Sequence, residues 1–229
     1  MKTLIIPDIH NKWKTAESIV EKEKADQVIF LGDHFDDFGD NPQIARETAI
    51  WLKSSLKKEN RIHLIGNHDC RYASANKNLG CSGYSEFKDY AINDILTPHD
   101  WLQLKWFYWL DDILITHAGL SLPFAKNLSI KEIKDLLNRE GARATEMMYK
   151  LGGKHWFFGC GIARYGNDAF GGLTWNDFNQ EFVPVTGLKQ IFGHSPQKTP
   201  TWKEKSLCLD THLKHYVIYE NAEIKICGV

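Results

Sequence analysis

The sequence lacks several features that would each point to a particular class of protein. Its five cysteines are odd in number and form no C-x-x-C pair, so they indicate neither a disulfide framework nor a cysteine zinc site. No apolar run approaches the ~20 residues of a membrane-spanning helix, and the first predicted strand leaves no room for a signal peptide. Lysine and arginine are scattered, and the formal net charge of -1 argues against a nucleic-acid-binding surface. We therefore expect a cytoplasmic protein with no membrane or nucleic-acid partner.

The length and composition predict one α/β domain covering residues 1–229. Hydrophobic residues make up 43% and charged residues 25%, which is ordinary for a globular protein with a single large core. Apolar runs alternate with stretches whose apolar residues recur at helical spacing, which predicts a sheet covered by helices on both faces. The predicted strands are the run beginning at Leu4, then 27–31, 61–65, 113–116, 189–192, 206–209, 215–219 and 223–226. The predicted helices are 14–24, 42–58, 129–138 and 141–151.

Three other stretches have unusual composition. Residues 71–84 are rich in Ala, Ser, Asn and Gly, and residues 152–172 are rich in glycine, so both are predicted to be loops that influence substrate choice. The aromatic stretch 100–110 would suit stacking on nucleic-acid bases. With only Lys105 interleaved, packing in the core is the better interpretation.

Five of the apolar runs end in side chains that bind metal ions. In chain order, the runs end at Asp8 and His10, at Asp33, at Asn67, at His117 and at His194. Ligands bind at the carboxyl ends of the strands in such sheets, so we expect these side chains to converge on one rim. Aspartate, histidine and asparagine without cysteine suit manganese, iron or zinc. A carboxylate able to bridge would allow a two-metal site for phosphoryl chemistry.

The same five blocks resemble the signature of the calcineurin-like metallophosphoesterases. The blocks are Asp8-x-His10, Gly32-Asp33-x-x-Asp36, Gly66-Asn67-His68-Asp69, His117 in Thr-His-Ala-Gly, and Gly193-His194. They occur in the family's order, and motifs in the right context are hypotheses that a structure can test. The segment Gly193-His194-Ser195-Pro196 is most similar to the phosphoprotein phosphatase and diadenosine tetraphosphatase branch. The resemblance implies a four-layer α/β fold, in which a two-sheet β-sandwich is flanked by helices.

The resemblance also implies a division of labour in the site. One metal ion would be held by Asp8, His10 and Asp33, and the second by the shared Asp33 with Asn67, His117 and His194. A hydroxide bridging the two divalent ions, which we expect to be manganese with iron or zinc as alternatives, would attack phosphorus. His68 would protonate the leaving oxygen and Asp36 would orient His68.

The sequence departs from the phosphatase pattern at the residues that hold phosphate. Asp37 stands where those enzymes carry a phosphate-binding arginine, so other cations must take that role. The candidates are Arg164, which resembles a family phosphate-binding arginine in placement, and Arg71, just after the central motif. His212 is an additional candidate ligand, and His34 is expected beside the site rather than on a metal.

Four functions remain open at this stage. The leading hypothesis is a phosphomonoesterase like the serine/threonine protein phosphatases, with a phosphorylated protein or small molecule as substrate. The second is a hydrolase of dinucleoside polyphosphates such as diadenosine tetraphosphate, with a nucleotide substrate. A phosphodiesterase or nuclease is disfavoured because Pro196 stands where many of those enzymes have a second histidine. A non-catalytic scaffold is disfavoured because the whole ligand set is present.

Overall fold

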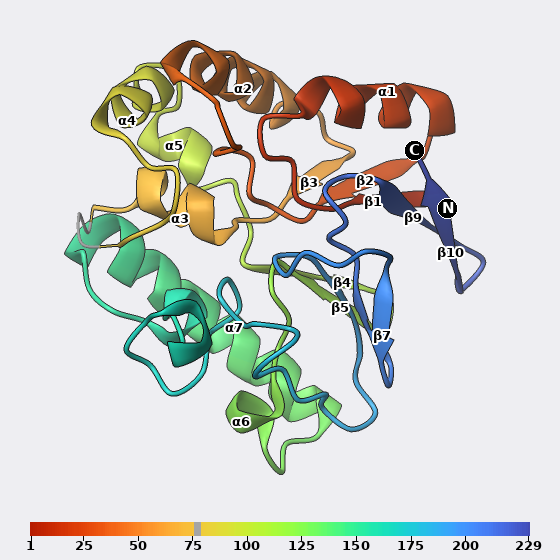
Figure 1. The fold of residues 1–229 in the computed structure, drawn as a ribbon. Coiled ribbons are helices and arrows are strands. Elements are labelled where there is room, and N and C mark those ends of the chain that lie inside the picture. Colours follow the sequence, from red (N-terminus) through yellow and green to blue (C-terminus); the bar gives the residue numbers. More distant parts are fainter. Residues whose placement is uncertain (76–78) are drawn as a thin grey trace.

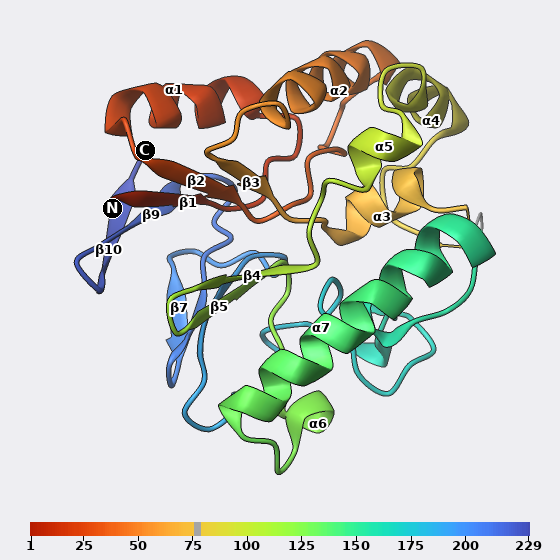
Figure 2. The ribbon, with the colours of Figure 1, turned by 180° about the vertical axis from the view of Figure 1, so that it is seen from behind.

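The protein is built from two five-stranded sheets packed face to face and flanked by helices (Figures 1 and 2). A computed structural model describes residues 1–75 and 79–229. The first sheet has the order β10 (Glu223–Gly228), β9 (His215–Glu220), β1 (Thr3–Ile6), β2 (Gln27–Phe30) and β3 (Arg61–His63). The second has the order β4 (Phe107–Leu110), β5 (Ile113–Thr116), β6 (Lys189–Phe192), β8 (Ser206–Cys208) and β7 (Thr201–Lys203).

This arrangement confirms the α/β sandwich and corrects the single sheet expected from the apolar runs. Strands β1, β2 and β3 pair in parallel in the first sheet, whereas β5, β6 and β8 pair in parallel in the second. A buried parallel strand has the same apolar pattern in either sheet, so the pattern alone could not assign the runs to two sheets.

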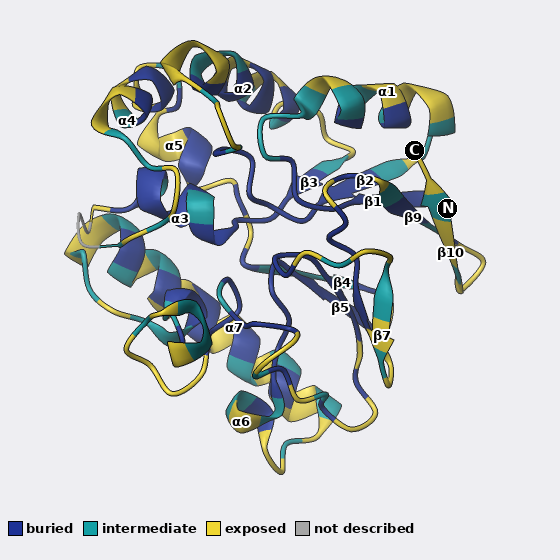
Figure 3. Cartoon of the chain, viewed as in Figure 1, coloured by how far each residue is buried: buried dark blue, intermediate teal, exposed yellow. Residues whose placement is uncertain are grey.

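The side chains of the strands alternate between two cores. Ile5 and Ile29 lie opposite each other in the register of β1 and β2 and join Ile115, Ile191 and Val217 in the core between the sheets. Their neighbours point to the other face of the first sheet, under the helices. Figure 3 shows the result, with buried strands inside and exposed outer faces on the helices. Burying each such side chain contributes about 1.5–3 kcal/mol, so the sandwich holds the strand ends firmly.

Two long helices cover the outer face of the first sheet (Figure 1). These are α1 (Trp13–Glu23) and α2 (Pro42–Ser55), and their residues Ala16 and Leu52 pack in one cluster with Leu4 and Phe30 of the sheet. Helix α2 begins where the sequence predicts, because the Asn41 side chain accepts a hydrogen bond from Ile44 N at 3.0 Å and Pro42 occupies the first turn.

The remaining helices surround the edge at which the parallel strands end. They are α3 (Asn67–Ala73), α4 (Glu86–Asn93), α5 (Pro98–Trp101), α6 (Leu122–Ala125) and α7 (Ile130–Glu146), with short helical turns at Met147–Leu151, Trp156–Phe158 and Ile162–Arg164. None of the helices in the described part of the chain combines the length and hydrophobicity needed to cross a membrane.

Three predicted boundaries are wrong. The separate helices 129–138 and 141–151 form one continuous helix, α7, extended by a π-helical turn. Gly141 lies inside it because the buried face formed by Ile133, Leu137 and Ala144 continues through this position, and burial of that face outweighs the weak helix preference of one glycine. The predicted loop 71–84 begins in helix α3 and ends just before α4, and its residues 76–78 lie outside the described part of the chain.

Candidate metal centre

The ends of four strands from both sheets deliver metal-ligand side chains to one place. Asp8 and His10 follow β1, Asp33 follows β2, His117 follows β5 and His194 follows β6. Ligand atoms of Asp8, His10 and Asp33 all lie within 4.8 Å of one another, and so do those of Asp33, His117 and His194. Asp33 therefore belongs to both groups, which is the arrangement that a bridging carboxylate needs.

The backbone around the centre is held in conformations that ordinary residues rarely adopt. His10, Asp33 and His194 have φ values of 42°, 47° and 68°. Such left-handed positions cluster at functional sites, where the surrounding structure holds them in place. Gly66 and Gly193 allow the close approach, since a Cβ atom would lie 2.1 Å from Asp33 Oδ1 at Gly66 and 1.8 Å from Asp8 Oδ1 at Gly193.

Backbone carbonyl groups orient two of the histidines. His10 Nδ1 lies 2.6 Å from the Asp36 carbonyl oxygen, and His117 Nδ1 lies 2.8 Å from the Leu31 carbonyl oxygen. Each Nδ1 therefore donates to a carbonyl oxygen, so Nε2 is the ring nitrogen that faces the cluster, 3.8 Å from Asp33 Oδ2 for His10 and 3.4 Å for His117. Metal-binding histidines are commonly fixed by such a hydrogen bond from the other ring nitrogen.

The chemistry of the centre fits a cation. His194 Nε2 is buried and has no hydrogen-bond partner in the described part of the chain. Burial and the positive charges of His117 and Arg164 hold the pKa of His194 well below its usual range, so its imidazole is neutral. The inner end of the Asn67 amide lies 2.8 Å from His194 Nδ1 and 3.2 Å from Asp33 Oδ2. If that end is the amide oxygen, it faces two other electron-pair donors, the His194 ring nitrogen and the Asp33 carboxylate. A cation bound near all three would offset the repulsion between them.

Burial and neighbouring charges act differently on the two aspartates. Burial, assisted by the charge of Asp210, raises the pKa of Asp8 well above its usual value. Burial also acts to raise the pKa of Asp33, but the charges of His117 and His68 outweigh it and hold this pKa well below the usual range. Burial opposes a charge on His117, yet Asp33 raises the His117 pKa to about 9. Asp33 is thus the carboxylate that remains ionised at the middle of the centre.

A histidine and an aspartate form a hydrogen-bonded pair beside the metal-ligand groups. His68 Nδ1 lies 2.9 Å from Asp36 Oδ2, and the His68 ring meets the His10 ring edge-on with centroids 5.3 Å apart. Burial opposes a charge on His68, but Asp33 and the hydrogen bond to Asp36 raise its pKa well above the usual value. This pair can hold a proton next to the centre, as a general acid must.

The sequence analysis missed the lysine on the other side of Asp36. Lys88 of α4 is buried and donates to Asp36 Oδ1 at 2.5 Å. The sequence did contain an indication that Lys88 is buried, because it shares one helix face with the apolar residues Ala91 and Ile92, three and four residues later. A charged residue on an apolar helix face needs a partner, and here the partner is Asp36.

The two candidate phosphate-binding arginines lie in different surroundings. Arg164 forms an ion pair with Asp177 at 2.6 Å and its Nη2 lies 3.2 Å from Ser195 Oγ, one residue after His194. Arg71 is buried in α3, and its guanidinium lies over the Tyr84 ring, 3.7 Å from the centroid. Arg164 thus contacts the residue next to the predicted metal ligand His194.

The two additional histidines lie outside the metal-ligand groups. Both ring nitrogens of His34 make hydrogen bonds, Nδ1 with Asp69 at 2.9 Å and Nε2 with His63 at 2.9 Å, so neither is available to a metal ion. His212 is exposed and belongs to none of the groups found among the described residues. His34 therefore lies beside the site, as expected, and the extra ligand considered at His212 has no support from the geometry.

A cavity of about 1090 Å³ opens beside the centre. Cys81, Arg164 and Trp175 line its inner part, and Trp175 lies edge-on to His194 with ring centroids 5.7 Å apart. Its outer wall includes Phe124 and Trp156, which stack with centroids 4.6 Å apart. Residues 154–170, which form much of that wall, belong to the predicted glycine-rich loop.

Comparison with known protein families agrees with the resemblance found in the sequence motifs. A sequence model of the family described as calcineurin-like phosphoesterase matches residues 1–198. Among curated protein sequences, none matches this chain significantly.

Solved structures show a similar fold at low sequence identity. A cold-active protein tyrosine phosphatase of a psychrophilic Shewanella species has a TM-score of 0.61 at 15% identity, over 99% of this chain and 77% of that one. A serine/threonine protein phosphatase from Saccharomyces cerevisiae has a TM-score of 0.53 at 14% identity, over 100% of this chain and 80% of that one. A candidate diadenosine tetraphosphatase has a TM-score of 0.53 at 16% identity, over 99% of this chain and 93% of that one. At these identities the similarity establishes the fold alone.

Proposed function

This chain belongs to the calcineurin-like phosphoesterases, which are metal-dependent phosphoester hydrolases, and from that premise we propose that it hydrolyses phosphomonoesters. The observation that carries the proposal is the sharing of Asp33 by two ligand groups, with the His68–Asp36 pair alongside. This combination would provide ligands for two cations and a proton donor, which are the groups that two-metal hydrolysis of a phosphate ester uses.

We assign the ligands of the two metal ions as the two groups suggest. Asp8, His10 and Asp33 would hold one ion, and Asp33, Asn67, His117 and His194 the other. When bound, the ions activate water and neutralise charge on the phosphoryl oxygens. Manganese is the proposed metal, with iron and zinc as alternatives, because the donors are oxygen and imidazole nitrogen without thiolate.

His68 is the proposed general acid. Its Nδ1 is occupied by Asp36, so Nε2 is the ring nitrogen that would donate a proton to the leaving oxygen. Asp36 fixes the tautomer and the ring orientation, and its negative charge stabilises the protonated ring before transfer. The protonated state of His68 is the one that Asp33 and Asp36 favour in the absence of metal ions.

Arg164 is the proposed phosphate-binding residue. Its Nε forms an ion pair with Asp177, and Asp177 accepts hydrogen bonds from the backbone of Asn179 and Gln180 at 2.8 and 2.9 Å. The anchored guanidinium would present its remaining N–H groups to phosphate oxygens, which arginine binds in a bidentate manner. Arg71 remains the alternative cation.

Replacing Arg164 by alanine should lower kcat/KM by about 10- to 100-fold, because a hydrogen bond to a charged group contributes about 1.5–3 kcal/mol. Arg164→Lys should lose less activity than Arg164→Ala but should not reach the wild-type value, since lysine keeps the positive charge but cannot form two parallel hydrogen bonds to phosphate. Steady-state kinetics with a phosphomonoester measures the effect, and Arg139→Ala, on the exposed face of α7, is the matched control. Wild-type kinetics for Arg164→Ala would assign the phosphate contact to Arg71 or another residue.

The aromatic cavity favours a second candidate function. Trp156 and Trp175 could stack against nucleobases, so hydrolysis of a dinucleoside polyphosphate is the alternative. A phosphoprotein substrate would use the same cavity for the residues that flank its phosphorylated side chain. The metal centre serves either substrate, and the choice depends on what the cavity binds.

The proposed function is tested by comparing substrates on the manganese-loaded protein. Initial rates are measured with a phosphoserine peptide, a dinucleoside tetraphosphate and a simple phosphodiester. A preference for the peptide by tenfold or more in kcat/KM would support the phosphomonoesterase. A preference for the dinucleotide would establish the second candidate, and a protein that binds two metal ions yet hydrolyses none of the three would contradict both.

A further inference from the structure

We propose that Lys88 is a positioning residue for catalysis, because its buried ammonium group fixes the Asp36 carboxylate that in turn orients His68. The proposal rests on the proposed function, in which His68 donates a proton to the leaving group. It concerns a residue of α4 that contacts neither of the two ligand groups that share Asp33 nor the cavity lining, since its contacts are with Asp36 and Asp40.

The two oxygens of the Asp36 carboxylate have different partners: Oδ2 contacts His68, and Oδ1 contacts Lys88 and Tyr72. Oδ2 faces His68 Nδ1 at 2.9 Å, whereas Oδ1 accepts from Lys88 Nζ at 2.5 Å and from the Tyr72 hydroxyl at 2.7 Å. Two donors on Oδ1 set the rotation of the carboxylate group, and that rotation directs Oδ2 at the imidazole. Without them, a carboxylate in this buried site would be free to turn away from His68.

Lys88 is well suited to hold that position. Its side chain is only 4% exposed, and its ammonium also donates to both oxygens of Asp40 at 3.0 and 3.1 Å. Asp40 in turn accepts from the Asn11 amide at 2.9 Å, beside the predicted ligand His10. Because a buried lysine must keep its partners or lose its charge, the ammonium is confined to the space between Asp36 and Asp40.

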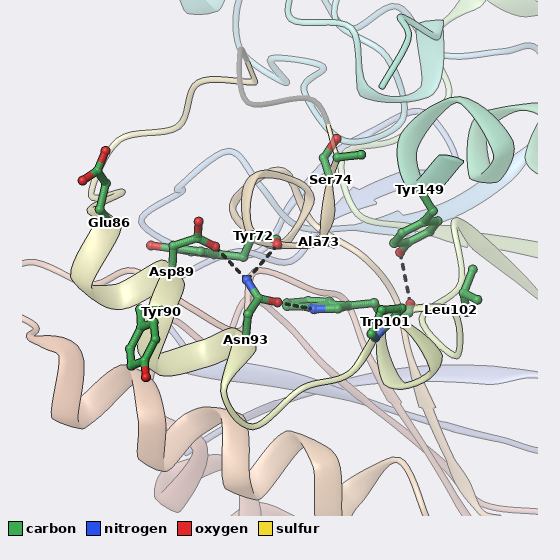
Figure 4. Close-up of a pocket in the computed structure, with 12 residues that line it drawn as sticks. Tyr72, Ala73, Ser74, Glu86, Asp89, Tyr90, Asn93, Trp101, Leu102 and Tyr149 are labelled. Carbon is green, nitrogen blue, oxygen red and sulfur yellow. Dashed lines mark hydrogen bonds between the residues drawn. The ribbon is translucent and has the colours of Figure 1, made fainter. Parts of the chain in front are cut away.

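The helix that carries Lys88 is itself tied to the helix that carries His68. Figure 4 shows Asn93 of α4 between Tyr72 of α3 and Trp101 of α5. The Asn93 amide donates to the Tyr72 carbonyl oxygen at 3.1 Å and accepts from Trp101 Nε1 at 2.9 Å. These residues line a pocket of about 480 Å³ that lies apart from the cavity beside the centre. The same Tyr72 supplies the second donor to Asp36, so α3 and α4 act on the carboxylate together.

A merely structural ion pair would support the fold without acting through His68. The two roles differ in one measurable respect, the dependence of the rate on the leaving group. A poor leaving group needs protonation as its bond to phosphorus breaks, whereas a good one departs without it. Misplacing the general acid therefore slows a poor leaving group selectively, whereas general loosening of the structure slows both.

The test is kcat for 4-nitrophenyl phosphate and for phenyl phosphate, a matched pair with a good and a poor leaving group, in manganese-loaded Lys88→Met. We expect kcat on phenyl phosphate to fall by about 10- to 100-fold, which is part of a general-acid contribution of about 10²–10⁴-fold. The loss on 4-nitrophenyl phosphate should be at least about fivefold smaller, and KM and metal content should stay near the wild-type values. The double variant with His68→Ala should be no slower than His68→Ala alone, because Lys88 acts through that histidine.

Lys53→Met is the matched control. Lys53 Nζ donates to the Ile95 carbonyl oxygen at 2.6 Å, just after α4, and lies 3.4 Å from Asp100. It therefore ties the same region of the fold without contacting Asp36, and its removal should leave the ratio of the two kcat values unchanged.

Asp40→Asn tests the proposal if Lys88→Met does not fold. This substitution weakens the ion pair with Lys88 while keeping nearly the same side-chain shape. It should lower kcat on phenyl phosphate more than kcat on 4-nitrophenyl phosphate, as expected for Lys88→Met. Equal losses on both substrates, or a further loss in the His68→Ala background, would overturn the role of Lys88. If wild-type protein hydrolyses neither ester, the proposed function itself fails. If His68→Ala is fully active, the general-acid role of His68 is removed, and the role of Lys88 is overturned with it.

Discussion

Replacing Asp33 by asparagine is expected to reduce the bound metal from two ions per chain to one or none. Asp33 is the residue common to both ligand groups, and its carboxylate lies between His10 and His117. Asparagine keeps the shape but removes the negative charge that two cations would share. Losing even an outer partner of a metal ligand costs about 10- to 100-fold in affinity, so losing the shared ligand should cost at least about 100-fold.

The measurement is elemental analysis of protein reconstituted with manganese and then passed through a desalting column. Thermal unfolding with and without manganese provides a second readout, because an ion bound only by the folded state raises Tm. Wild-type protein should gain in Tm, and Asp33→Asn should gain little.

Asp37→Asn is the control for loss of a neighbouring carboxylate. Asp37 pairs with Lys12 at 2.8 Å and lies outside the ligand groups found among the described residues, so two ions should remain. Retention of two tightly bound ions by Asp33→Asn would refute its assignment as the shared ligand.

Replacing His68 by alanine is expected to lower kcat by about 10²–10⁴-fold while both metal ions stay bound, which is the typical contribution of a general acid. The loss should be largest for substrates with poor leaving groups. His68 belongs to neither of the two ligand groups that share Asp33, and its backbone N–H donates to Asp33 Oδ1 at 3.0 Å, a contact that alanine keeps. The effect should therefore appear in turnover and not in metal content.

The control for loss of a histidine is His99→Ala, at an exposed position of α5. Its kcat should equal that of the wild type. A His68→Ala protein with unchanged kcat on phenyl phosphate would remove the general-acid role, and one that had lost its metal ions would instead indicate that His68 supports the centre.

Much of the candidate site could be predicted because its residues follow their strands directly. Asp8, Asp33, His117 and His194 lie within three residues of a strand end, and a strand end is visible as the point where an apolar run stops. Because each of these residues is so close in sequence to its strand, the position of the strand end also places its side chain at the edge of the sandwich. The predicted ligand side chains lie close together, as expected, even though their strands belong to two sheets, because the parallel strands of both sheets end at the same edge of the sandwich.

Loops and helix boundaries were harder to predict because their determinants lie elsewhere in the chain. Gly141 has a weak local preference for helix, but the buried face of α7, which includes Leu137 and Ala144 on either side of it, keeps the helix continuous. The beginning of the expected loop after His68 proved helical, since α3 starts at the ligand motif itself. The cytoplasmic location stays a prediction.

The sequence by itself determined that Asp8, His10, Asp33, His117 and His194 follow buried strands, since strand periodicity and motif order are properties of neighbours in the chain. Only the tertiary structure decided what surrounds them. Lys88 reaches Asp36 across 52 residues, and Arg164 reaches Ser195 across 31. Such contacts depend on how α4 and the turn at Ile162–Arg164 pack against the sandwich. Packing depends on the shapes of distant side chains, so no local pattern in the sequence could specify it.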